Sequence, residues 1–140
     1  MLLITHRLQV RFRDCDPLGH VNNAVYLTYL EQARFNLWKA QLGFVAKSAA
    51  DKGPRGIGFI LARVEIDFRA QAKYGDELDV KLSLDGFGRT SFTYSYEIVD
   101  AATGQLVTTA KTVLVRFDYD TQKPTVLDDA AKAQLSITVQ

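Results

Sequence analysis

Two carboxylates, Asp14 and Asp16, lie in a polar turn just before a long apolar segment. Because Asp16 directly precedes Pro17, its backbone is expected to be extended rather than helical. A carboxylate ahead of a helix start could attack a carbonyl carbon or activate a water molecule. The unpaired N–H groups of the first helical turn, near Asn22–Val25, could stabilise the resulting oxyanion. Alternatively, Asp14 or Asp16 merely closes the turn through its side chain, as aspartates commonly do.

His20 and Glu31 are two further candidates for acid–base chemistry. An imidazole titrates near neutral pH, so His20 could transfer protons, or it could simply cap the turn. Glu31 falls two turns into a segment expected to be largely buried, where a carboxylate seldom stays unpaired. Arg34, three residues later, could neutralise Glu31 as an ion pair. In the functional alternative, Glu31 faces a cleft beside Asp16 of its own or a neighbouring subunit.

Several other chemistries lack the residues that they need. His6 and His20 are far apart and have no Cys or carboxylate at ligand spacing, so no metal site and no cofactor is predicted. No Gly-x-Ser-x-Gly motif marks a serine nucleophile, and no Gly-x-Gly-x-x-Gly or Walker sequence marks a nucleotide site. Cys15 lies between two aspartates, which disfavours a thiolate nucleophile.

Size and composition indicate one globular domain, residues 1–140, with its own core, since 47% of the residues are hydrophobic. A net charge of +1 gives no field that would attract nucleic acid. The single cysteine excludes an intramolecular disulfide. Polar residues interrupt the first ten positions, so no signal peptide is expected, and no apolar run is long enough to span a membrane. We therefore expect a soluble, cytoplasmic protein.

The segment after the turn predicts the element that would position these groups. Apolar residues alternate four and three apart, which is the helix period, at Tyr26, Leu30, Ala33, Leu37, Ala40 and Phe44. Further apolar residues lie off that stripe, at Leu27, Tyr29, Phe35, Trp38 and Leu42. A helix that is apolar over most of its circumference must be wrapped by the rest of the protein. Gly43 is expected to end it.

Alternating apolar and polar residues predict strands on both sides of this helix. Thr5–Arg13 is predicted as the first strand, with Leu8, Val10 and Phe12 on its buried face. The segment 59–70 is predicted as the second, with the even-numbered residues from Ile60 to Ala70 on its apolar face.

The remaining chain predicts three more strands, at 78–84, 91–98 and 106–119, and a short helix at 128–135. Asp85–Gly88 is expected to connect two of the strands, and Lys123-Pro124 to break the last one. Short connections predict that the four strands after the long helix form an antiparallel meander, whose apolar face only that helix can cover. The prediction is an α+β fold, with a long central helix wrapped by a curved antiparallel sheet of about five strands.

The turn and the helix together resemble a known signature. Asp14-Cys15-Asp16-Pro17-Leu18-Gly19-His20-Val21-Asn22-Asn23, followed by Tyr26, Tyr29, Glu31, Ala33 and Arg34, is similar to the motif of hotdog-fold acyl-CoA thioesterases, in the 4-hydroxybenzoyl-CoA thioesterase branch. The similarity continues through 64–68, 74–78 and 88–92, and so covers nearly the whole chain. It implies the hotdog fold, in which a curved sheet surrounds a helix, in agreement with the element order.

The resemblance also implies roles for individual residues. Asp16 would be the catalytic carboxylate, as nucleophile or general base, and the backbone N–H of Asn23 would polarise the thioester carbonyl. A related branch uses a carboxylate on the central helix instead, for which Glu31 is the candidate. Arg89, Thr90 and Ser91 correspond to a turn and strand start of the family. This segment often contacts the pantetheine or phosphate end of coenzyme A. Such proteins are generally homodimers or homotetramers with sites between subunits, and act on acyl-CoA or acyl carrier protein thioesters.

The resulting hypothesis is hydrolysis of an acyl-CoA thioester to the free acid and coenzyme A, with Tyr26 and Phe59 lining the acyl pocket. His20 departs from the apolar residue of the hydroxybenzoyl enzymes, so an aromatic substrate is not implied. Two alternatives stay open. One is a dehydratase or hydratase of 3-hydroxyacyl thioesters that uses His20 and Glu31 as its acid–base pair. The other is a non-catalytic module that binds acyl-CoA.

Overall fold

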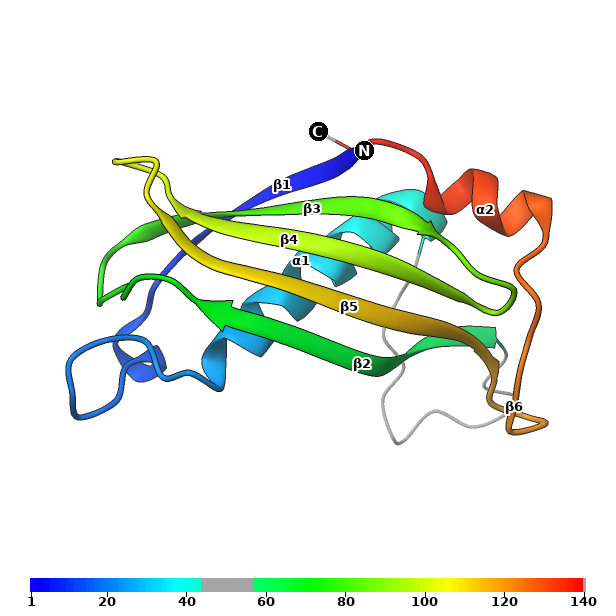
Figure 1. Cartoon of the computed structure of the whole chain (residues 1–140), viewed down its shortest axis with the longest axis horizontal. Helices are drawn as coiled ribbons and strands as arrows, with labels where there is room; N and C mark the ends of the chain where they lie inside the picture. The colour runs from blue at the N-terminus through cyan, green and yellow to red at the C-terminus, as the bar shows by residue number, and fades with distance from the viewer. Residues whose placement is uncertain (44–56, 140) are drawn as a thin grey trace.

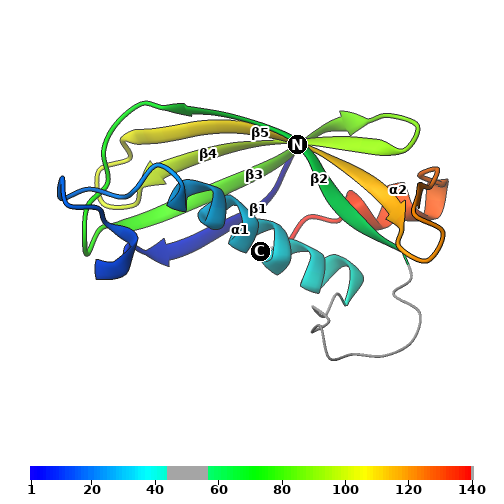
Figure 2. The ribbon, with the colours of Figure 1, turned by 90° about the horizontal axis from the view of Figure 1, so that it is seen from below.

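A computed structural model describes residues 1–43 and 57–139 of the protein, and in it a six-stranded antiparallel sheet covers a long helix (Figure 1). The elements in chain order are β1 (Leu2–Gln9), the 3₁₀ helix η1 (Phe12–Asp14), α1 (Val25–Leu42), β2 (Ile57–Phe68), β3 (Glu77–Phe87), β4 (Ser91–Asp100), β5 (Leu106–Asp118), β6 (Lys123–Pro124) and α2 (Asp129–Leu135). Figure 2 shows α1 crossing beneath one face of the sheet. The predicted helix wrapped by a curved antiparallel sheet is confirmed.

The long helix α1 follows the predicted stripe. Leu30, Ala33 and Leu37 have no exposed surface, and they pack in one core with the inward-facing residues of the sheet. The opposite side of α1 is less covered than predicted, because Leu27 and Phe35 remain 40% and 39% exposed. The last residue of the predicted stripe, at position 44, lies outside the described residues. Within one chain, therefore, α1 is wrapped on one side and leaves apolar surface on the other.

Gly43 ends α1 as predicted. Its φ of 65° lies in the left-handed region, and its N–H donates to the carbonyl oxygens of Lys39 and Trp38. A side chain is disfavoured there by backbone strain alone, because a Cβ at this position would meet no atom within 4 Å.

Replacing Gly43 with alanine should therefore lower the free energy of unfolding by about 1 kcal/mol. Gly86→Ala is the matched control, since a Cβ there also meets open space while its φ is not positive. Urea denaturation of both variants measures the difference. An equal effect at the two positions would show that the left-handed backbone at Gly43 does not matter.

The strand order corrects the predicted meander. The sheet runs β1-β3-β4-β5-β2, so β2 pairs with β5 rather than with β3, and the meander holds only for β3, β4 and β5. The short connection between β2 and β3 predicts that these two strands pair as neighbours. In the structure, the chain from 69 to 76 instead crosses from the β2 edge of the sheet to β3, which lies one strand in from the opposite edge, where β1 pairs with it.

Two β-bulges change which residues face the core. The pairing of β2 with β5 shifts between Leu61 and Arg63, so Ala62 is an extra residue that reverses the alternation. As a result Phe59, not Ile60 as predicted, packs against Trp38 and Phe92, with ring centroids 5.2 and 5.1 Å apart. A second shift, between Leu84 and Gly86, lets β3 continue to Phe87.

Three smaller predictions about strand ends are also wrong. The first strand ends at Gln9, because η1 follows it, and Phe12 is 80% exposed rather than inward-facing. The β3–β4 connection is the turn at 88–90 and not Asp85–Gly88, which belongs largely to β3. Lys123-Pro124 does not simply break the chain but pairs with Phe117 and Asp118 as β6.

The short helix predicted at 128–135 is confirmed as α2, capped by the Asp128 side chain.

Candidate active site

The turn that carries Asp16 has a defined conformation. The Gly19 N–H donates to the Asp16 carbonyl (3.0 Å), which closes a four-residue turn with Pro17 at its second position and a φ of 90° at Gly19. Proline and glycine favour these positions because proline presets φ and glycine tolerates a positive φ. The Asp16 N–H then donates to the His20 carbonyl (3.1 Å), so the loop folds back on itself.

Asp14 anchors this turn to the body of the protein. It is 3% exposed, and its carboxylate accepts hydrogen bonds from the Arg11 backbone N–H (3.0 Å), the Arg11 guanidinium (3.1 Å) and the Tyr29 hydroxyl (2.8 Å). Its carbonyl accepts from the Asn22 N–H (2.9 Å), at the far end of the turn. The alternative considered for Asp14, a structural role, is therefore what the contacts show. Its link to Tyr29 was missed, and the only sequence signal was a tyrosine lying off the helix stripe.

These contacts keep Asp14 ionised. Burial acts to raise the pKa of Asp14, but the hydrogen bonds from Arg11 and Tyr29 outweigh it and hold the pKa below its usual value. Burial, followed by the bond to Asp14, raises the pKa of Tyr29. Because the folded-state pKa of Asp14 is the lower one, its contribution to stability is present above the unfolded-state pKa and is lost as the pH falls through the folded-state value.

The Asp16 carboxylate accepts fewer hydrogen bonds than that of Asp14. Oδ1 accepts a hydrogen bond from the Leu18 N–H (2.9 Å), which is the turn-closing role considered as an alternative. Oδ2 has no hydrogen-bond partner among the described residues, and the residue is half-buried. His20 is also half-buried, with Nδ1 3.3 Å from the Val21 carbonyl oxygen. One carboxylate oxygen of Asp16 is thus available for chemistry.

The start of α1 leaves one backbone donor open. Asn22 closes the turn that leads into the helix, because its side-chain oxygen accepts from the Ala24 N–H and its carbonyl from the Val25 N–H, both at 2.9 Å. The Asn23 N–H has no acceptor among the residues that the structure describes. An unpaired amide at the positive end of an 18-residue helix is suited to bind a developing negative charge.

Glu31 lies further along α1 and away from the turn. None of the hydrogen bonds or ion pairs in the described parts of the chain joins it to Asp16, His20 or Arg34, so the ion pair considered for Glu31 and Arg34 does not form. Glu31 is exposed and lines a hollow of about 220 Å³ between α1 and β2. No hydrogen bond or ion pair in the described parts of the chain joins the proposed acid–base pair of His20 and Glu31.

The candidate substrate-binding residues divide between two ends of the molecule. Tyr26 lies at the start of α1, where it is buried against Phe68 at the end of β2 (ring centroids 5.4 Å apart). Phe59 lies near the start of β2 and packs against Trp38 in the second half of α1. Nine residues of strand, roughly 30 Å, separate Phe59 from Phe68.

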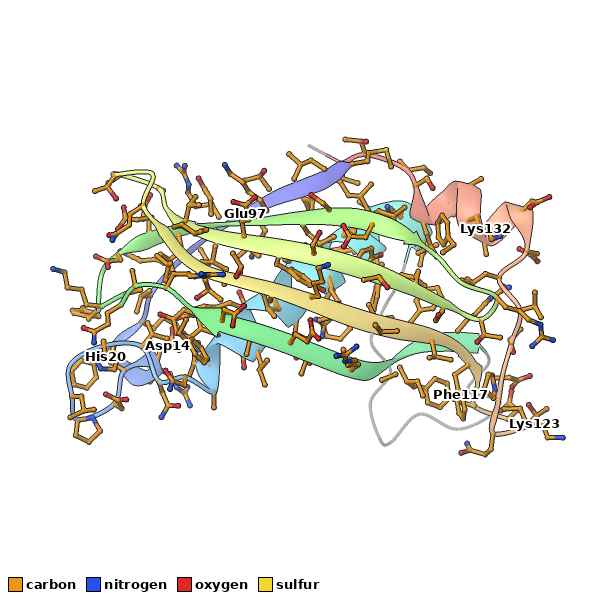
Figure 3. All side chains as sticks on the ribbon, viewed as in Figure 1. Asp14, His20, Glu97, Phe117, Lys123 and Lys132 are labelled. Atoms are coloured by element: carbon orange, nitrogen blue, oxygen red, sulfur yellow. The ribbon has the colours of Figure 1, made fainter. Side chains whose placement is uncertain are left out.

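The turn that contains Arg89, Thr90 and Ser91 lies at the same end as Phe59. The Arg116 N–H donates to the Thr90 carbonyl (2.8 Å), and Arg116 is the β5 residue paired with Phe59. Figure 3 shows the separation, with His20 and Asp14 at one end and Phe117, Lys123 and Lys132 at the other. A hollow of about 290 Å³ lies there, lined by Phe59, Arg116 and residues of α2. One chain therefore does not bring Phe59 or the 89–91 turn to Asp16.

The described residues contain neither a metal-ligand cluster nor a helix suited to cross a membrane. In the ranges 1–43 and 57–139, no three His, Cys, Asp or Glu side chains are grouped so that they could hold a metal ion. Neither helix in those ranges has both the length and the apolar character needed to cross a bilayer.

Comparison with known proteins identifies relatives along nearly the full chain. Long-chain acyl-CoA thioesterase FadM of Escherichia coli is 29% identical over 134 residues, which are 96% of this chain and 98% of that protein. A 1,4-dihydroxy-2-naphthoyl-CoA hydrolase of Synechococcus elongatus is 28% identical and covers 92% of each chain. Among solved structures, YbaW, a probable thioesterase from Escherichia coli, superposes with a TM-score of 0.78 at 26% identity, covering 97% of this chain and 98% of that one.

The family model of the thioesterase-like superfamily matches residues 10–135, a span that begins before the Asp14–Asn23 turn and ends at the last residue of α2. This match and the superposed thioesterase structure confirm the predicted family, the hotdog fold and the enzyme class. The chain belongs to the thioesterase-like superfamily.

Proposed function

We propose that this protein hydrolyses an acyl-CoA thioester to the free acid and coenzyme A, with Asp16 as the catalytic carboxylate and the Asn23 N–H as oxyanion donor. The observation that carries the proposal is the presence, in one turn at one end of the molecule, of a carboxylate oxygen and a helix-start amide that both lack hydrogen-bond partners among the described residues. The names of the relatives FadM and 1,4-dihydroxy-2-naphthoyl-CoA hydrolase support acyl-CoA as the substrate class.

The chemistry has two routes that end in the same products. In the first, Asp16 Oδ2 attacks the thioester carbonyl, the C–S bond breaks, the thiolate takes up a proton, and water then hydrolyses the mixed anhydride. In the second, Asp16 accepts a proton from water, which attacks the carbonyl directly. In both routes the Asn23 N–H and the positive end of α1 stabilise the tetrahedral oxyanion. Label found in Asp16 after a single turnover in oxygen-18 water would identify the first route, because water that attacks the Asp16 carbonyl of the anhydride leaves its oxygen on that side chain.

A homodimer would unite the two ends of the site. β2 is an edge strand, and along its outer side no strand of the described residues pairs with it. If two β2 strands paired antiparallel about their midpoint, Phe59 of one copy would approach Phe68 and Tyr26 of the other, and the Arg89–Ser91 turn would follow it. Asp16 of one copy and the coenzyme A contacts of the other would then share one substrate. Whether two such dimers pair, and whether the protein is cytoplasmic, stay predictions.

The test of the function is thiol release from a panel of acyl-CoA thioesters, followed with a chromogenic thiol reagent. We expect hydrolysis of at least one saturated or aromatic acyl-CoA at rates well above the spontaneous reaction. Crotonyl-CoA is included, because loss of its enoyl absorbance without thiol release would identify a hydratase instead. Binding of acyl-CoA without turnover across the panel would identify a binding module and overturn the proposal.

A further inference from the structure

Arg34 is a buried cation that forms no ion pair with any described residue. It is 5% exposed, and its Nη1 donates to the Tyr96 hydroxyl (3.3 Å), which in turn is 2.7 Å from the Thr112 hydroxyl. The ion pairs of the described residues all involve other side chains. The neutral hydroxyl of Tyr96 satisfies part of the hydrogen-bonding capacity of the guanidinium but does not compensate its charge. An uncompensated charge inside a protein is costly in free energy. An anion from outside the chain would therefore stabilise Arg34.

The hollow beside Arg34 contains an unused anion as well. Arg34 and Glu31 both line the space of about 220 Å³ between α1 and β2, whose other walls are mainly aliphatic. Glu31 is exposed at its rim and takes part in no ion pair with another described residue. The hollow thus presents one positive and one negative group that do not meet within the chain. A free anionic ligand fits poorly, because Glu31 would repel it.

The hollow lies on the side of α1 and β2 that the rest of the chain leaves exposed. Leu27 on α1 and Leu61 on β2 both line it and are 40% and 46% exposed. Leu61 and Val64, which form its β2 wall, flank the midpoint of that strand. An axis relating two antiparallel β2 strands about that midpoint would therefore pass close to the hollow, and two copies of the hollow would face each other.

We propose that in the homodimer the Glu31 carboxylate of each copy forms an ion pair with the Arg34 guanidinium of the other. This proposal rests on the homodimer proposed above and names the contact that holds it. Two-fold symmetry makes the pairing reciprocal, so one interface contains two such bonds and leaves neither charge uncompensated. Glu31 is then an interface residue and does not take part in the chemistry.

A charge-reversal experiment on the full chain tests the pairing. One chain carries Glu31→Arg and is cationic at both positions, while a second, differently tagged chain carries Arg34→Glu and is anionic at both. Each variant alone would place like charges across the interface, whereas a mixed dimer would satisfy both pairs. On co-expression we expect native mass spectrometry to find the mixed dimer at least about tenfold more abundant than the two homodimers together, a ratio that would be one for random pairing. A 1:2:1 distribution of the three dimers would overturn the proposal, as would wild-type dimerisation of each variant alone.

A second measurement covers the case in which Arg34→Glu, at a buried position, does not fold. Glu31→Arg changes an exposed residue, and we expect it to raise the dimer dissociation constant at least about a hundredfold by analytical ultracentrifugation. Glu97→Arg, on an exposed position of β4, is the matched control and should leave that constant unchanged. Equal constants for wild type, Glu31→Arg and Glu97→Arg would overturn the proposal.

The result is separable from the proposed function, since association is measured without substrate. If the wild-type protein releases no thiol from any acyl-CoA while Glu31→Arg still dissociates the dimer, the function fails and the ion pair stands. If Glu31→Arg dimerises normally while Arg34→Met selectively loses hydrolysis of glutaryl-CoA relative to pentanoyl-CoA, a substrate carboxylate occupies the hollow. That outcome overturns the interface proposal and leaves the hydrolase.

Discussion

The Asp16→Asn variant is expected to lower kcat by roughly 10²–10⁴-fold while changing KM little. The amide keeps an oxygen that can accept the Leu18 N–H bond, so the turn should persist. What it loses is the negative charge that attacks the carbonyl or accepts a proton from water, an interaction made mainly in the transition state. Steady-state thiol release with the best acyl-CoA of the panel measures both constants.

Asp100→Asn is the matched control for this variant. The Asp100 Oδ1 accepts the N–H of the residue two positions later, Ala102, at 2.9 Å, which repeats the geometry of Asp16 and Leu18 in a turn that follows β4. Both variants should have wild-type circular dichroism and unfolding midpoints. Turnover within twofold of wild type in a folded Asp16→Asn protein would remove this carboxylate from the mechanism.

The Asp14→Ala variant should have the largest effect on stability, a loss of about 2–4 kcal/mol in the free energy of unfolding. It leaves the buried Tyr29 hydroxyl without its acceptor and the Arg11 guanidinium without its carboxylate. Because Asp14 also anchors the turn that carries Asp16, kcat should fall in the protein that remains folded. Urea denaturation at pH 7 measures the stability loss.

A double-mutant cycle with Tyr29→Phe isolates the central bond of this network. We expect a coupling energy of about 1 kcal/mol or more, because the two groups are in direct contact and buried. Asp79→Ala is the comparison, since it removes an ion pair with the largely exposed Arg7 and should cost less than about 1 kcal/mol. Equal losses for Asp14→Ala and Asp79→Ala would show that the buried position of Asp14 confers no special stability.

Local pattern was enough to predict the elements but not their neighbours. The four-and-three spacing along α1, its glycine terminator and the alternation of β3 to β5 are properties of adjacent residues, and the structure confirms them. The position of β2 in the sheet depends on pairing between distant strands: β1 pairs with one side of β3, so β2 pairs with β5 instead. The length of the connection between β2 and β3 does not reveal this pairing. The extra residue at Ala62 likewise follows from the pairing with β5 and not from the sequence of β2 alone.

In the candidate site, too, local features could be predicted from the sequence and long-range contacts could not. A turn at 14–23 could be predicted, because proline, glycine and asparagine act over a few residues. The distance between Asp16 and Phe59 could not be predicted, since it depends on the direction of β2 along α1. Tyr29 could be assigned to the helix but not to Asp14, fifteen residues away, because that contact needs the folded turn.

An exposed strand edge ordinarily invites open-ended polymerisation, and the homodimer proposed through β2 would limit that hazard. Identical edges that join antiparallel use up one edge of each sheet, and the edge left over is β1. There the C-terminal segment bonds to the strand through the Val139 N–H and the Leu3 carbonyl (2.7 Å). Assembly through β2 would therefore stop at a closed pair rather than extend along an open edge.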